Sequence, residues 1–297
     1  MFKPLATFCL LAPWILLPFW PSASSPPLAP PAAQPADWVQ LPAKPRILIT
    51  NDDGIQSDGI VQLARALSVI ADVTVVAPDD NRSGSSGSST VFSEPLVVTE
   101  QQMQGIGTVY AVSGTPVDAA EFGLLHLGQD HPFDLIISGI NAGLNVGEVA
   151  HYSGTVGAAM EGPAFGVPGI AISQMSRQGF QRAAEFAVVF VQKLIAEGAR
   201  KGMVYSINIP DQVKLPLPVR SGPMGGRYLQ VKAFAKVADD GNSKTYRAIT
   251  KFDSQAPPGS DTHLVFSNQI SITPLPFQWA DADALQHLQQ WKFDDVQ

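Results

Sequence analysis

The sequence predicts an α/β protein built on a mostly parallel sheet with flanking helices. Three observations lead to this fold class. Short apolar runs alternate with stretches of helical periodicity between residues 46 and 209. Several of those runs end in polar, glycine-rich loops, as the strands of open α/β sheets do. A strand, a helix and a second strand follow one another within residues 45–78, and this spacing predicts a parallel crossover unit.

The first elements are predicted as follows. The apolar run that ends in Ile47-Leu48-Ile49-Thr50 has the length of a buried strand. Apolar residues then recur at helical spacing, which predicts an amphipathic helix over about 57–70. The run Asp72–Pro78 predicts the second strand of the crossover unit.

The later elements rest on the same two patterns. Alternating segments predict antiparallel strands within 91–112, and Pro116 in a first turn marks the next helix. Further strands are expected at 133–138, 167–173, 204–209 and 269–274, further helices at 116–128, 153–166, 179–198 and 279–292, a loop at 139–152, and a β-rich stretch at 211–265.

Composition limits the classes of partner. The chain has 297 residues, of which 45% are hydrophobic, so it can bury a sizeable core. Its formal net charge of −7 argues against polymeric nucleic acid or an anionic membrane as a partner. One small anion bound through a metal is compatible with that charge.

The N-terminal segment has the pattern of an export signal. Lys3 precedes a mostly apolar stretch, and small residues follow near Ala23. Residues 1–23 are therefore predicted to be a signal peptide and 24–44 a Pro/Ala-rich linker, which places the protein in the periplasm or outside the cell. An uncleaved membrane anchor and a later cut near Ala33 are the alternatives. The single cysteine, Cys9, lies inside the signal, so the mature chain has no thiol ligand or nucleophile.

The most informative local motif is Asn51-Asp52-Asp53-Gly54, directly after the first strand. Adjacent carboxylates repel each other and stay ionised most easily beside a cation, and oxygen ligands suit Mg²⁺, Mn²⁺ or Ca²⁺. The competing interpretation is a turn in which the aspartates only accept hydrogen bonds from nearby backbone N–H groups. The tetrapeptide alone leaves both open.

Later loops supply groups that favour the metal interpretation. Loops after parallel strands meet at one edge of the sheet, so the hydroxyl of Ser83 and the carbonyl of Asn141 can complete the shell of a cation. Ser153-Gly154-Thr155 opens a predicted helix, where backbone N–H groups and two hydroxyls can bind a phosphate. Together these groups predict a site that binds a metal ion and a phosphoryl group.

At these residues the chain resembles the SurE family of metal-dependent 5′/3′-nucleotidases and acid phosphatases. The matching motifs occur in order across about 45–275. They are Asn51–Gly54, Ala77-Pro78 with Arg82-Ser83-Gly84, Gly114–Pro116, Ser138–Gly143, Tyr152–Val156 with Met160–Gly162, and Ser271–Pro274.

The resemblance implies a Rossmann-like α/β core over 45–210 and 266–297, with 211–265 as a β-rich extension used to form a homodimer or homotetramer. It implies one divalent ion, Mg²⁺ or Mn²⁺ with Ca²⁺ as the alternative, held by Asp52, Asp53, Ser83 and Asn141. It also implies hydrolysis of nucleoside monophosphates, sometimes with broader phosphomonoester activity.

The roles expected at the site follow from both arguments. Asp52 and Asn141 are the expected catalytic residues, attack comes from a metal-bound water, and an aspartyl-phosphate path is the lesser alternative. Gly84 joins Ser153, Gly154 and Thr155 in the expected phosphate-binding set. For His151 a substrate contact competes with a plain exposed loop residue, and for Arg82 a phosphate contact competes with a pair to Asp79 or Asp80. A non-catalytic nucleotide- or metal-binding protein is the second candidate function.

Overall fold

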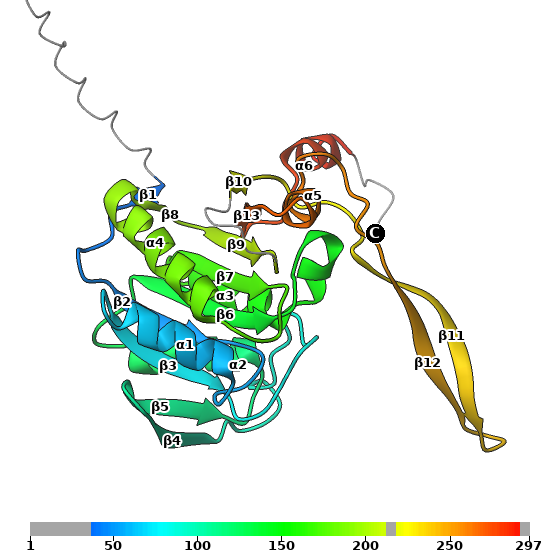
Figure 1. Ribbon diagram of the computed structural model, residues 1–297, viewed down its shortest axis with the longest axis horizontal. Helices are drawn as coiled ribbons and strands as arrows, with labels where there is room; N and C mark the ends of the chain where they lie inside the picture. Colours follow the sequence, from blue (N-terminus) through cyan, green and yellow to red (C-terminus); the bar gives the residue numbers. More distant parts are fainter. Residues whose placement is uncertain (1–36, 212–217, 292–297) are drawn as a thin grey trace, which may run out of the picture. The chain divides into compact units, whose positions relative to one another are not determined.

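The computed structural model describes residues 37–211 and 218–291, and Figure 1 shows its ribbon. The predicted signal peptide lies outside the described residues, so it stays a prediction. None of the helices in the described part of the chain combines the length and the hydropathy of a transmembrane span.

The predicted linker 24–44 needs a correction at its C-terminal end. Strand β1 (Trp38–Val39) pairs antiparallel with β8 (Ala199–Arg200), and Leu41 is buried. Residues 37–44 therefore belong to the folded part, because the apolar side chain of Leu41 joins the main core.

A nine-stranded sheet forms the centre of the fold, in the order β10-β13-β9-β7-β6-β2-β3-β5-β4. Neighbours pair in parallel except at β9–β13 and β4–β5, so the predicted mostly parallel α/β sheet is confirmed. The strands are β2 (Arg46–Thr50), β3 (Asp72–Pro78), β4 (Val98–Met103), β5 (Gly107–Val112), β6 (Leu135–Ala142), β7 (Gly169–Gln174), β9 (Met203–Ile209), β10 (Val219–Ser221) and β13 (Ile270–Pro276).

Helices cover both faces of this sheet (Figure 1). Alternate residues of β2 point to opposite faces, so Ile47 and Ile49 pack in the core beneath α1 and α4, and Leu48 packs in the core beneath α2 and α3. The helices are α1 (Asp58–Leu67), α2 (Pro116–Phe122) continued by a π-helical turn at Gly123–Leu127, a 3₁₀ turn η2 (Gly147–Tyr152), α3 (Gly154–Ala164), α4 (Gln181–Glu197), α5 (Asp261–Phe266) and α6 (Ala282–Leu288).

The predicted loop 139–152 is wrong over its first residues, because β6 continues through the glycine motif to Ala142. The pairing of β6 with β7 shifts register between Ser138 and Asn141. Gly139 has φ +137°, and a Cβ there would lie 2.4 Å from the carbonyl oxygen of Ile172, so only glycine fits. This register shift is a β-bulge directly before Asn141, and such bulges are common beside functional sites.

The predicted extension 211–265 divides into parts with different surroundings. Strand β10 joins the central sheet through β13, and α5, which the sequence pattern did not indicate, begins at Asp261. Strands β11 (Leu229–Asp239) and β12 (Lys244–Phe252) pair only with each other in the described part of the chain. This hairpin exposes large apolar side chains such as Phe234. Its role in oligomer formation stays a prediction.

Candidate active site

The candidate site lies where the sheet order reverses direction. From β2 the chain proceeds to β3 on one side, and it later returns to place β6 on the other side of β2. Ligands of open α/β sheets bind at such a switch point, beyond the carboxyl ends of the strands. The loops after β2 and β3 and the end of β6 meet there.

The carboxylate of Asp53 links all three of these segments. Its Oδ1 accepts a hydrogen bond from Asn81 Nδ2 at 3.2 Å, and Asn81 follows β3. Its Oδ2 accepts from the backbone N–H of Ala142 at 3.2 Å, next to Asn141 at the end of β6. Asn81 Oδ1 in turn accepts from the backbone N–H of Ser83 at 3.0 Å. The predicted partners Asp53, Ser83 and Asn141 are therefore brought to one place.

Asp52 is the buried member of the pair, with 3% of its surface exposed. Its Oδ1 accepts a hydrogen bond from Thr155 Oγ1 at 2.6 Å, and its backbone oxygen accepts from the N–H of Arg82 at 2.7 Å. Burial raises the pKa of Asp52 to about 6, and the negative charge of Asp53 adds to the rise while donors from Thr155 oppose it. A cation beside this carboxylate would favour its charged form.

The turn interpretation of the motif applies to Asn51 instead of the aspartates. Asn51 Oδ1 accepts from the backbone N–H of Gly54 at 3.2 Å, and its Nδ2 donates to Gly54 O at 2.9 Å and to Ser57 Oγ at 2.7 Å. Both carboxylates thus face other loops of the site instead of closing their own turn.

The oxygen atoms at the site are suitable ligands for a hard divalent cation. Asn141 Nδ2 donates to Gly143 O at 2.8 Å, which turns its Nδ2 away and leaves Oδ1 as the acceptor available to a ligand. Ser83 is exposed. Among the described residues no group of three acidic, histidine or cysteine side chains has an arrangement that could hold a metal ion, so a cation here would depend on two carboxylates and neutral oxygens. Mg²⁺ is commonly held by one or two carboxylates together with water and substrate oxygens.

The N-terminus of α3 faces Asp52. A Cβ on Gly154 would lie 2.8 Å from Asp52 Cβ and 2.8 Å from Ser85 Oγ, so the absence of a side chain allows this approach. Ser153 Oγ caps the helix by accepting from the N–H of Val156 at 3.1 Å. The hydroxyl of Thr155 is fully buried and committed to Asp52. It therefore positions the carboxylate in this structure, whereas a direct phosphate contact was expected of it.

Two features of the site were not predicted from the sequence. Ser85 Oγ is buried beside Gly154 and has no hydrogen-bond partner among the residues that the structure describes, which leaves its hydroxyl free to donate. Behind Thr155, Asn145 Nδ2 donates to Ser173 Oγ at 2.8 Å, and the Asn145 N–H donates to Asn208 Oδ1 at 2.8 Å. Polar residues inside the otherwise apolar strand β9 were the available signal, because buried polar groups require partners.

The remaining candidates have the following positions. Arg82 donates to Ser113 O at 3.1 Å and pairs with Asp79 at 3.3 Å, which is the structural alternative considered for it. Gly84 is exposed with φ +79° and has open space around it. His151 is exposed, and its backbone oxygen accepts from Ser86 Oγ at 2.7 Å.

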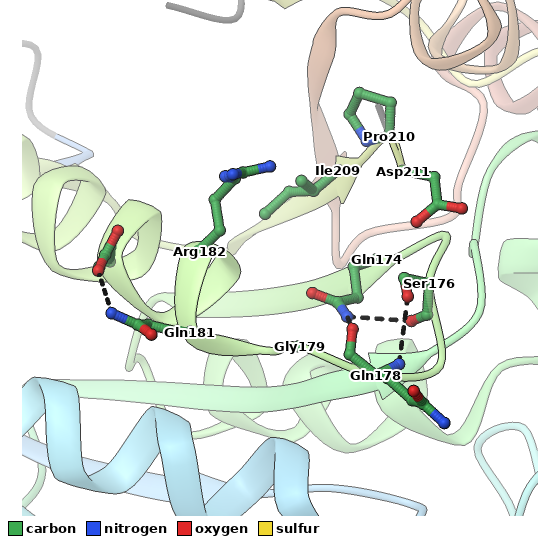
Figure 2. A pocket seen from close by; sticks show the side chains of 10 residues that line it. Gln174, Ser176, Gln178, Gly179, Gln181, Arg182, Ile209, Pro210 and Asp211 are labelled. Carbon is green, nitrogen blue, oxygen red and sulfur yellow. Dashed lines mark hydrogen bonds between the residues drawn. The ribbon is translucent and has the colours of Figure 1, made fainter. Parts of the chain in front are cut away.

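Two hollows lie near this edge of the sheet. The first, of about 640 Å³, begins at Ser85 and Ser153 and is lined further by α3 and by the segment after β13. The second, of about 500 Å³, follows β7 and β9, and Figure 2 shows its lining. There Gln174 Nε2 donates to the backbone oxygens of Ser176 and Gln178, both at 3.0 Å. The second hollow contains none of the predicted site residues.

Fold and site together define an α/β protein with a two-carboxylate site at the switch point of its sheet. A family model described as Survival protein SurE matches residues 47–229. A protein named 5′-nucleotidase SurE from Aliivibrio fischeri is 38% identical over 250 residues, covering 84% of this chain and 95% of the relative. One of the same name from Clostridium botulinum is 32% identical over 252 residues, covering 82% and 98%.

A comparison with solved structures also indicates similarity to a SurE protein. The crystal structure of the SurE protein from Aquifex aeolicus aligns with a TM-score of 0.71 at 32% identity, covering 83% of this chain and all of that one. The chain belongs to the SurE family, as its motifs predicted.

Proposed function

We propose that this protein is a divalent-metal-dependent phosphomonoesterase that hydrolyses nucleoside 5′- or 3′-monophosphates. The observation that carries the proposal is the carboxylate of Asp53, which accepts from Asn81 and Ala142 and so gathers three loops beside the buried Asp52. Family membership supports it, because the curated relatives are named 5′-nucleotidases.

The metal would be held by Asp52, Asp53, Ser83 and Asn141, whose oxygens fit Mg²⁺ or Mn²⁺. When bound, such an ion supplies charge neutralisation for the phosphate and lowers the pKa of a coordinated water. The chain's own part is to hold these oxygens in place. Thr155 fixes Asp52 through its hydroxyl, and Asn81 ties the Ser83 backbone to Asp53.

The phosphoryl group is expected beside Gly154. The Ser85 hydroxyl, which has no hydrogen-bond partner in the described part of the chain, lies next to this glycine, and the backbone N–H of Gly154 stands at the start of α3. Donors of this kind stabilise the charge that develops on phosphoryl oxygens in the transition state. Water is the nucleophile in this proposal, since both aspartates are assigned to the metal.

The test is phosphate release from p-nitrophenyl phosphate and from a panel of nucleoside monophosphates, in EDTA and with added Mn²⁺ or Mg²⁺. We expect release that EDTA abolishes and the metal restores, with nucleotides among the substrates. A well-folded protein that binds nucleotides but releases no phosphate under any of these conditions would instead be a non-catalytic binding protein. A phosphorylated enzyme trapped during turnover would overturn the direct attack by water.

A further inference from the structure

The 640 Å³ cleft beside α3 is lined in part by residues that border the proposed phosphate position. Ser85 and Ser153 are among its lining residues, and both lie next to Gly154. The group that leaves from a phosphate bound near Gly154 therefore has this cleft available to it. The volume is within the range of small-molecule sites, about 300–1,000 Å³.

The outer wall of the cleft is apolar and partly aromatic. Met160 and Met224 line it together with Phe277 and Trp279, which follow β13. Trp279 is 87% exposed, so core packing does not account for its position. An exposed aromatic face beside methionine side chains offers a stacking surface for a flat ring.

One carboxylate in the cleft accepts no hydrogen bond from the described residues. Glu161 lines the cleft from α3, and its carboxylate makes no hydrogen bond or ion pair with any residue that the structure describes. Its burial, together with the negative charges of Glu121 and Asp118, raises the pKa of Glu161 to about 7. Asp118 differs, because Ser89, Thr90 and Thr115 all donate to it. Glu161 is therefore the acceptor that an incoming hydrogen-bond donor would satisfy.

We propose that the cleft binds the nucleoside part of the substrate, with the base stacked on Trp279 and Glu161 accepting a hydrogen bond from the nucleoside. This inference rests on the proposed function and deepens it. A flat apolar ring that also carries hydrogen-bond donors matches both the aromatic wall and the lone carboxylate, whereas a sugar phosphate would leave the wall unused.

A kinetic comparison tests the assignment. Adenosine 5′-monophosphate carries the base, and ribose 5-phosphate lacks it. We expect Trp279→Ala to lower kcat/KM for the nucleotide about tenfold, mainly through KM, and for ribose 5-phosphate less than twofold. Glu161→Gln should lower it about fivefold for the nucleotide. The matched control is Phe92→Ala, since Phe92 is 89% exposed and lies outside the cleft lining. Equal losses on both substrates, or no loss on the nucleotide, would overturn the assignment.

A binding experiment separates this inference from the proposed function. Saturation-transfer NMR with adenosine, which has no phosphate, should show transfer to the base protons in the wild type and in Phe92→Ala, but much less in Trp279→Ala. If adenosine binds in this way while the wild type releases no phosphate from any substrate, the nucleoside-binding cleft is supported and the proposed phosphatase activity is refuted. If the wild type gives no transfer, or Trp279→Ala gives as much, the nucleoside cleft is refuted.

Discussion

Asp52→Asn is expected to lose at least about a hundredfold in phosphatase activity and, in metal-free buffer at pH 8, to be more stable than the wild type. The two effects share one cause. Asp52 is 3% exposed, and burial together with Asp53 raises its pKa to about 6 from an ordinary value near 3.8. Without a cation, the charged carboxylate disfavours the folded state, and asparagine removes that charge.

The sign of the change in stability with pH follows from the number of protons bound by the folded and unfolded states. Between about pH 4 and pH 6 the folded wild type holds a proton on Asp52 that the unfolded chain releases. Its metal-free stability therefore falls as pH rises through this window and the loss is complete above it. The rise of the Asp52 pKa from 3.8 to about 6 corresponds to a loss of about 3 kcal/mol in the free energy of unfolding above this window. Asp52→Asn should lack this fall in stability. The melting temperature of the variant minus that of the wild type should therefore increase by about 5–10 °C from pH 4 to pH 8.

Thermal unfolding in EDTA across pH 4–8 measures this effect, and Asp118→Asn is the matched control. Hydrogen bonds from Ser89, Thr90 and Thr115 outweigh the burial of Asp118 and hold its pKa below the ordinary value. Its replacement should therefore destabilise the protein most at high pH, the opposite sign. If Asp52→Asn follows the wild-type pH dependence, the buried-charge account of Asp52 is wrong.

Gly154→Ala is expected to remove most activity, on the order of a hundredfold, and to destabilise the protein by about 1–3 kcal/mol. The new Cβ would lie 2.8 Å from Asp52 Cβ and from Ser85 Oγ, and 3.0 Å from Asp52 Oδ2. Asp52 cannot yield easily, because Thr155 fixes its carboxylate, and Ser85 Oγ would have to leave its buried position. The carboxylate would be pushed away from its place opposite Asp53.

Gly87→Ala is the control for this prediction. Gly87 lies in the same serine-rich loop, and a Cβ there meets nothing within 4 Å. Because Gly87 also lines the proposed nucleoside cleft, the comparison uses ribose 5-phosphate, which lacks the base, and both the activity on it and the melting temperature should remain close to those of the wild type. The measurements are initial rates with saturating Mn²⁺ and thermal unfolding of both variants. An active Gly154→Ala would mean that the N-terminus of α3 is not part of the catalytic arrangement.

Much of this fold could be predicted because its signals are local. The apolar run at Arg46–Thr50 and the helical spacing over α1 each depend on a few neighbouring residues, and both elements form as expected. The convergence of Asp53 with Ser83 and Asn141 was also predictable, since it needs only parallel strands with loops at one edge.

The rest depends on pairings that no local pattern encodes. Thr155 and Asp52 are separated by 103 positions, so the hydroxyl that fixes the carboxylate could not be distinguished from a phosphate ligand. The bulge that carries β6 through Gly139 is set by the neighbouring strand β7. Trp279 enters the cleft from the far end of the chain, where periodicity indicated only a helix. Each of these three features depends on contacts between segments that are far apart in the sequence.

The most direct measurement of the central claim is phosphate release from adenosine 5′-monophosphate as Mn²⁺ is added to EDTA-treated protein, for the wild type and for Asp53→Asn. Asp53 is only half-buried, so its replacement should leave the fold intact. We predict that wild-type activity rises from background to saturation and that the variant needs at least about ten times more Mn²⁺. Full wild-type activity in EDTA, or the same Mn²⁺ dependence in both proteins, would contradict a metal site at the aspartate pair.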